Sequence, residues 1–287
     1  MLLKNTELSK VLVKRSISVK PTTSLLEARE IMFKHKIKRL VVLGTKEKPV
    51  GIITEKDIAK TVYNLGNKSI KSIRVRDFMS KKLITVTIKN SIYDCAKLMK
   101  NKKIGSVLVL NPNGSLAGII TKTDLVSVFL TQATSPLKVS DIMTRKVITV
   151  TPNDTILLVE SLLIKYRITR IIVQRNQIPV GIITHRDFVP AKIPHWIAES
   201  ADPKELQDFR AEVHLTEFNA NQLAYLLPFK AIDIMTSNPI TIDAKEDVSV
   251  AALLMIRHNV SGLPVVKKSR LVGILTKSDI VSAIAKH

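Results

Sequence analysis

The sequence predicts a mixed α/β (α+β) protein made of four tandem repeats, each with the order strand, helix, strand, strand, helix. Three observations predict this fold class. A heptapeptide of the form Gly-Ile-Ile/Leu-Thr-x-x-Asp occurs at residues 51–57, 118–124, 181–187 and 273–279. A second motif, Asp-x-Met-Ser/Thr, opens three of the units, at residues 77–80, 141–144 and 233–236. Between the motifs, apolar residues at helical spacing give way to short β-branched runs.

Each unit can be followed element by element. Short first strands are expected at residues 17–19, 84–86, 148–150 and 240–242. Ser24 and Ser91 are expected to cap the helices that follow, because each has an acidic residue three positions later. Two strands come next, separated by turn residues such as those at 111–114. The closing Thr-x-x-Asp then starts a second helix, with Thr as its N-cap. Residues 10–13 of the first unit do not match the opening motif.

Composition limits the class of protein. The chain has 287 residues, of which 45% are hydrophobic, so it can bury a substantial core. It contains no apolar run of about 18 residues, which predicts no membrane span. With the single Cys95 and no signal peptide, a cytoplasmic protein is expected. No P-loop, His-Glu-x-x-His motif or cysteine pair occurs, so neither catalysis nor a metal site is predicted.

The two motifs and the order of elements resemble the CBS domain family over most of the chain. This resemblance implies that repeats pair through their sheets, so that four repeats form two pseudo-symmetric modules packed as a disc. The repeats are expected at 8–66, 74–132, 138–190 and 230–287, with a partly helical, acidic insertion at 191–229.

The resemblance also implies an adenine-nucleotide site at each Thr-x-x-Asp, where a helix N-terminus favours an anion. The implied ribose ligands are Asp57, Asp124, Asp187 and Asp279. The implied hydroxyl partners are Thr54, Thr121, Thr184 and Thr276, and further candidates on the first strands are Ser18, Thr85, Thr149 and Thr241. The expected ligand is AMP, ADP or ATP, with S-adenosylmethionine as a further candidate. The alternative is that each Thr only caps a helix and each Asp only compensates its dipole.

Basic residues before the second strand differ between repeats. In nucleotide-binding members of the family a basic residue at this place neutralises phosphate, and here Lys38, Arg39 and Arg170 occupy it in the first and third repeats. The second and fourth repeats have Gly105-Ser106 and Ser261-Gly262 instead. The sites are therefore expected to be unequal, with one tight site in each module. The alternative is that Arg39 and Arg170 are surface residues of a strand.

The charge is strongly one-sided. The chain carries a net charge of +21, and residues 1–140 alone hold 27 Lys and Arg against 9 Asp and Glu. Lysine patches without interleaved aromatic residues suit phosphate contacts, so structured RNA is expected as a partner, with the ribosome favoured. The predicted RNA-binding residues are Lys34, Lys36, Lys68, Lys71, Arg74, Arg76, Lys81, Lys82, Lys97, Lys100, Lys102 and Lys103. A solvated basic surface without a dedicated partner is the simpler interpretation.

Two functions therefore remain open from the sequence. The first is a nucleotide-responsive regulator that associates with RNA or the ribosome. The second is an energy sensor that controls a protein partner, similar in repeat number to the γ subunit of AMP-activated kinase. A homodimer or a protein contact through the insertion is compatible with either.

Overall fold

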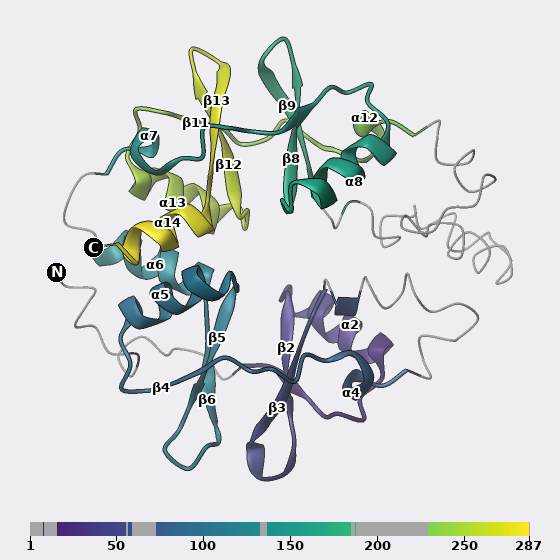
Figure 1. Ribbon diagram of the computed structural model, residues 1–287, viewed down its shortest axis with the longest axis vertical. Coiled ribbons are helices and arrows are strands. Elements are labelled where there is room, and N and C mark those ends of the chain that lie inside the picture. Colours follow the sequence, from purple (N-terminus) through teal and green to yellow (C-terminus); the bar gives the residue numbers. More distant parts are fainter. Residues whose placement is uncertain are drawn as a thin grey trace, which may run out of the picture.

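Four small sheets, one in each repeat, form the framework of the protein (Figure 1). The computed structural model describes residues 8, 16–55, 57–58, 73–132, 137–184, 187 and 229–286. In each sheet a short first strand pairs in parallel with a middle strand, which pairs antiparallel with the third strand. Each middle strand carries a register shift between its fourth residue and the next one. The mixed α/β fold predicted from the sequence is confirmed.

The described elements follow the predicted order, and the closing helices expected in repeats 1 and 3 lie almost wholly outside the described residues. Repeat 1 contains β1 (Ser18–Val19), α2 (Leu25–Lys34), β2 (Arg39–Leu43), the short 3₁₀ helix η2 (Thr45–Glu47) and β3 (Pro49–Thr54). Repeat 2 contains β4 (Thr85–Thr87), α5 (Ile92–Lys102), β5 (Ser106–Leu110), β6 (Leu116–Thr121) and α6 (Lys122–Gln132). Repeat 3 contains β7 (Thr149–Val150), α8 (Ile156–Lys165), β8 (Arg170–Arg175) and β9 (Ile178–Thr184). Repeat 4 contains β11 (Ile242–Asp243), α13 (Val248–Arg257), β12 (Gly262–Lys267), β13 (Arg270–Thr276) and α14 (Lys277–Ile284).

Local sequence explains where the first helix of each repeat begins. The hydroxyl of Ser24 accepts a hydrogen bond from the Glu27 amide, and that of Ser91 accepts one from the Asp94 amide, each at 3.1 Å. Thr155 caps α8 and Asp247 caps α13 in the same way. These side chains satisfy amides that would otherwise lack a partner at the helix start. The N-caps predicted at Ser24 and Ser91 are confirmed.

The Asp-x-Met motif connects the two repeats of a module. It forms a single helical turn in each case: α4 (Val75–Phe78), α7 (Val139–Ile142) and α12 (Ala231–Ile234). Each turn precedes one repeat of a module in sequence but packs on the other repeat of the same module. Ser80, after α4, exchanges backbone hydrogen bonds with Ile52 of repeat 1, and Thr144, after α7, does so with Ile274 of repeat 4. Strand β10 (Thr236–Ser237), after α12, pairs with β9 of repeat 3.

The same exchange explains the glycine that begins three of the four heptapeptides, Gly51, Gly181 and Gly273. A Cβ atom on Gly51 would collide with the side chain of Met79, and one on Gly273 would lie 2.8 Å from the Met143 sulfur. Glycine therefore lets the methionine of the opening motif lie against the third strand. Repeat 1 lacks the opening motif, but Leu8 at its start packs on the other repeat in the same way. It lies in the core of repeat 2, and its amide donates to the Asn90 carbonyl. Repeats 1 and 2 thus form one module, and repeats 3 and 4 form the other.

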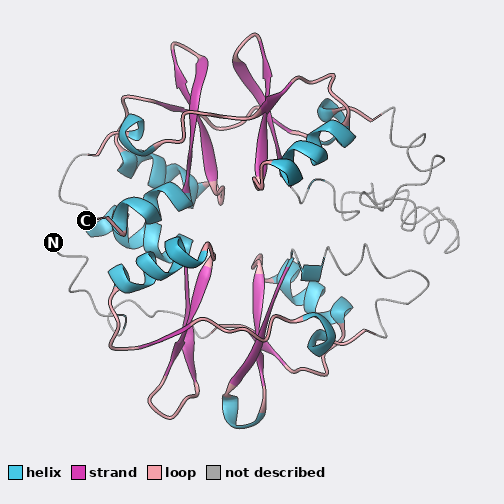
Figure 2. Cartoon of the chain, in the orientation of Figure 1, coloured by secondary structure: helices cyan, strands magenta, loops and turns pink. Residues whose placement is uncertain are grey.

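The two modules lie in one flattened layer, with repeats 2 and 4 in contact on one side (Figures 1 and 2). There α5 packs on α14 and α13 packs on α6, while α6 and α14 contact each other. The buried residues of repeats 2 and 4 form one continuous apolar cluster, which includes Met99, Leu125, Met255 and Ile280. Among the described residues, repeats 1 and 3 each have a separate core. The disc-like arrangement is therefore held on this side by a shared core.

Candidate functional site

The Thr-x-x-Asp segment has the same geometry in all four repeats. In each repeat one carboxylate oxygen of the aspartate accepts hydrogen bonds from both the amide and the hydroxyl of the threonine. The amide bonds are 2.7–2.9 Å long and the hydroxyl bonds are 2.6–2.9 Å long. The aspartate half of a capping box is thus formed by all four pairs, at Thr54–Asp57, Thr121–Asp124, Thr184–Asp187 and Thr276–Asp279. In repeats 1 and 2 the threonine hydroxyl also accepts a hydrogen bond from the aspartate amide, at 3.3 Å and 3.4 Å.

This capping has a consequence for ligand binding. Because each threonine hydroxyl gives its one proton to its own aspartate, it has no second proton to donate to a phosphate. The other carboxylate oxygen faces a different neighbour: in Asp279 it accepts from the Thr144 hydroxyl at 3.4 Å. A phosphate at this helix start would therefore depend on amides and on cationic side chains from elsewhere.

The first-strand candidates lie on the parallel strand of each sheet. Ser18 is opposite Val41, Thr85 is opposite Leu108 and Thr149 is opposite Ile172. Thr149 accepts a hydrogen bond from the Gln174 amide group at 2.9 Å, while Thr85 is exposed. Thr241 directly precedes β11 and is partly buried.

The basic residues before the second strands reach into the partner repeat. Arg39 begins β2 of repeat 1, yet its guanidinium lies against Gly105 of repeat 2, where a Cβ atom would be 3.1 Å from Nη2. Arg170 begins β8 of repeat 3, and its Nη2 donates to the Ser261 hydroxyl of repeat 4 at 3.0 Å. A Cβ atom on Gly262 would collide with the Arg170 guanidinium. The glycines of repeats 2 and 4 therefore provide the space for an arginine from the partner repeat.

The charge of each arginine consequently interacts with the aspartate of its partner repeat. Burial lowers the pKa of Arg39, and the charges of Asp124 and then Glu55 act against this. Burial likewise lowers the pKa of Arg170, and the charge of Asp279 acts against it. Lys38 lies beside Arg39, and its carbonyl accepts from the Glu55 amide at 3.1 Å.

Two lysines that sequence reasoning did not single out complete the arrangement. Lys122 and Lys277 are the first residues of α6 and α14. The Lys122 ammonium donates to the Ser278 hydroxyl at 2.7 Å, and the Lys277 ammonium donates to the Thr123 hydroxyl at 3.0 Å. Both bonds therefore cross from one module to the other. The available signal was a lysine directly after the threonine in repeats 2 and 4, where repeat 1 has Glu55 and repeat 3 has His185.

These four cations are close enough to repel one another. Burial is the largest cause that lowers the pKa of Lys122, followed by the charges of Arg39 and Arg170. Burial also lowers the pKa of Lys277, followed by the charge of Arg170, while Asp124 raises it. Lys277 is only 7% exposed, which is unusual for a lysine. We call Arg39, Lys122, Arg170 and Lys277 the central cation cluster.

The central cation cluster has the chemistry of an anion site. Within the part of the chain that the structure describes, none of its four members forms an ion pair with a carboxylate. Lysine at the first position of a helix also opposes the helix dipole. Partly buried cations in this arrangement are costly unless an anion joins them. Phosphate groups, which arginine and lysine both recognise, match this need.

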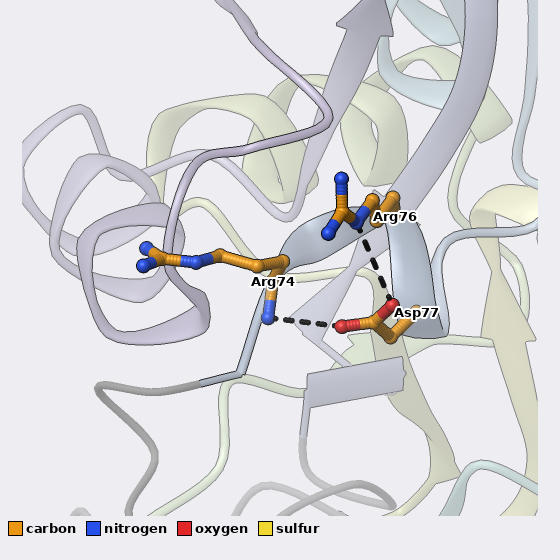
Figure 3. Close-up of polar contacts among 3 residues, drawn as sticks. All are labelled: Arg74, Arg76 and Asp77. Atoms are coloured by element: carbon orange, nitrogen blue, oxygen red, sulfur yellow. Dashed lines mark hydrogen bonds and ion pairs between the residues drawn. The ribbon is translucent and has the colours of Figure 1, made fainter.

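The predicted RNA-binding residues are spread over repeats 1 and 2. Lys68 and Lys71 lie outside the described residues. The others are exposed: Lys34, Lys36, Arg74, Arg76, Lys81, Lys82, Lys97, Lys100, Lys102 and Lys103. At α4, Arg76 forms an ion pair of 3.9 Å with Asp77, whose carboxylate also accepts from the Arg74 amide, and the Arg74 side chain extends away from both (Figure 3). Exposure suits contact with a polyanion but does not identify one, so RNA binding stays a prediction.

Two further features concern the described residues. No helix there combines the length and apolar character that crossing a membrane requires. No group of three or more His, Cys, Asp or Glu side chains there could hold a metal ion. The acidic insertion expected at 191–229 lies almost wholly outside the described residues, and so does His185.

Paired repeats that exchange their opening turns, each closed by a capped Thr-x-x-Asp, define the class of this protein. The CBS domain family model matches residues 8–64, 75–131, 139–193 and 231–286, and the chain belongs to that family. Among individual proteins it is similar to protein MJ1225 of Methanocaldococcus jannaschii, with 26% identity over 95% of this chain and 96% of the relative.

The crystal structure of MJ1225 supports the comparison in three dimensions. It has a TM-score of 0.78 and 25% identity, covers 98% of this chain and 100% of its own, and is described as a proposed archaeal homologue of γ-AMPK. An uncharacterised conserved protein from Pyrococcus horikoshii has a TM-score of 0.65 at 16% identity, covering 97% of this chain and 100% of its own, which shows the shared fold alone.

Proposed function

We propose that this chain is a regulatory protein that binds adenine nucleotides at the Thr-x-x-Asp segments of repeats 2 and 4. The observation that carries this proposal is the central cation cluster. Asp124 has Arg39 and Lys277 beside it, and Asp279 has Arg170 and Lys122 beside it. An aspartate that can accept from ribose hydroxyls, next to cations that can bind phosphate, is what a nucleotide requires.

The same geometry ranks the four sites. Repeat 1 has Glu55 where repeats 2 and 4 have lysine, and Arg39 and Arg170 lean away from their own repeats. The sites of repeats 2 and 4 therefore have the stronger positive potential. This keeps the prediction of one tight site in each module, but assigns that site to the repeat without its own basic residue.

Similarity to MJ1225 supports the regulatory part of the proposal. That protein's description relates it to the γ subunit of AMP-activated kinase, and this favours an energy sensor acting on a protein partner over an RNA-associated factor. The proposal includes no catalytic step. AMP, ADP and ATP are the expected ligands, and S-adenosylmethionine remains a candidate because it shares the adenosine group.

Titration calorimetry with AMP, ADP, ATP and S-adenosylmethionine tests the proposal directly. Arg39→Ala and Arg170→Ala should each weaken nucleotide binding by about tenfold or more, because a charge-assisted bond to phosphate is lost. Arg175→Ala is the matched control, because Arg175 is an exposed residue at the other end of β8. Undetectable binding of all four ligands would overturn the proposal. Loss on changing Asp57 or Asp187, but not Asp124 or Asp279, would overturn the ranking of sites.

A further inference from the structure

The two lysines of the central cation cluster are exchanged between modules. Lys122 belongs to repeat 2, yet its ammonium is bonded to Ser278, which directly precedes Asp279 of repeat 4. Lys277 belongs to repeat 4, and its ammonium is bonded to Thr123, which directly precedes Asp124 of repeat 2. Each lysine therefore ends at the start of the opposite helix. The arrangement is reciprocal, as the pseudo-twofold relation of repeats 2 and 4 requires.

The partners of these lysines are neutral. A hydroxyl oxygen satisfies one of the three protons of an ammonium group but does not neutralise its charge. The fields of nearby carboxylates follow the same crossed pattern, because Asp279 acts on Lys122 and Asp124 acts on Lys277. Each ammonium can therefore turn from its hydroxyl to a phosphate at that helix start without losing a salt bridge.

We infer that each nucleotide site takes its phosphate-binding lysine from the other module: Lys277 for the site at Asp124, and Lys122 for the site at Asp279. This inference rests on the proposed function and adds its phosphate ligands. Each site then combines an aspartate from one repeat, an arginine from its partner repeat and a lysine from across the disc. A module separated from its neighbour would hold an incomplete site.

Among the described residues, this exchange of side chains occurs between repeats 2 and 4. In repeat 1 the equivalent of Lys122 is Glu55, whose carboxylate would repel a phosphate rather than bind it. The exchange of lysines thus coincides with the one side of the disc on which the described helices share a core. Docking of the modules and completion of the sites are then the same structural event.

Single-site backgrounds test the crossing. In the full-length Asp279→Ala variant only the Asp124 site remains intact, and Lys277→Met should then weaken ATP binding by about tenfold or more, whereas Lys122→Met should change it less than about threefold. In the Asp124→Ala background the two effects should be reversed. Methionine retains the buried aliphatic stem of Lys277, and thermal unfolding checks that each variant is folded. Lys267→Met, an exposed residue at the end of β12, is the control.

The outcomes separate this inference from the proposed function. If each lysine acts on the site of its own module, or if both act equally on both sites, the crossing is overturned while nucleotide binding stands. If neither lysine matters although ATP binds, the lysines are not phosphate ligands and the inference is again overturned. If the unaltered chain binds no adenine nucleotide, the proposed function fails and the inference fails with it.

Discussion

Repeats 2 and 4 differ from repeats 1 and 3 at one helix position that decides how the modules meet. The residue five positions after the N-cap is Arg29 in repeat 1, Ala96 in repeat 2, Glu160 in repeat 3 and Ala252 in repeat 4. The two alanines are fully buried in the shared core, whereas Arg29 is exposed and Glu160 is partly buried. Small apolar residues let helices approach closely, and charged ones prevent it. Repeats of nearly identical plan can therefore differ in role, because one pair joins the modules through small apolar residues where the other pair has charged side chains.

The largest effect is expected when the glutamate of repeat 3 is introduced at the equivalent position of repeat 4, in the core that joins the modules. Ala252→Glu would place a carboxylate in the core between α13 and α6, where the described neighbours are apolar. We expect a loss of about 3 kcal/mol or more in the free energy of unfolding, measured by urea denaturation. Glu160→Ala is the matched control and should be neutral or stabilising. A loss below about 1 kcal/mol for Ala252→Glu would contradict the comparison.

A moderate, pH-dependent effect is expected at Glu160 itself. Burial raises the pKa of Glu160 to about 8 from an ordinary value of 4.5. The folded protein then binds more protons than the unfolded chain between these values, so stability falls as pH rises from about 4.5 to about 8. Glu160→Gln removes this dependence, and should raise the melting temperature by about 2 °C at pH 9 with no change at pH 4. An equal shift at both pH values would show that ionisation is not the cause.

The smallest perturbation uses a thiol as a probe of opening. Cys95 is buried in the shared core, and burial raises its pKa to about 12, so native protein should react slowly with a thiol reagent. Val159 is the equivalent buried residue of α8, four positions after its N-cap. In a Cys95→Ala background, Val159→Cys should be labelled at least about tenfold faster than Cys95 is in the unaltered chain, because its core is separate and smaller. Equal labelling rates would mean that the shared core gives no extra protection.

How much the sequence could predict follows from the range of each interaction. Ser24, Ser91 and the four Thr-x-x-Asp segments were predictable because their contacts lie within four residues along the chain. The partner of Arg39 was not predictable, because Gly105 belongs to another sheet. From the sequence, Gly105 indicated only that repeat 2 lacks a basic residue, whereas it provides the space for the Arg39 side chain. The exchange of Lys122 and Lys277 depends on how two modules dock, and no local pattern contains that information. For the arginines, the sequence did contain one indication, which was that a repeat with an arginine before its second strand is followed by a repeat with a glycine there.

The exchanged opening turns limit how such a protein can be divided or multiplied. A fragment beginning at Arg74 would carry α4 without the β3 strand on which it packs, and would leave repeat 1 without Met79 against its core. A single repeat is therefore not an independent structural unit, whereas a pair of repeats contains both of the opening segments that hold it together. Growth of this architecture by gene duplication should accordingly proceed in steps of two repeats.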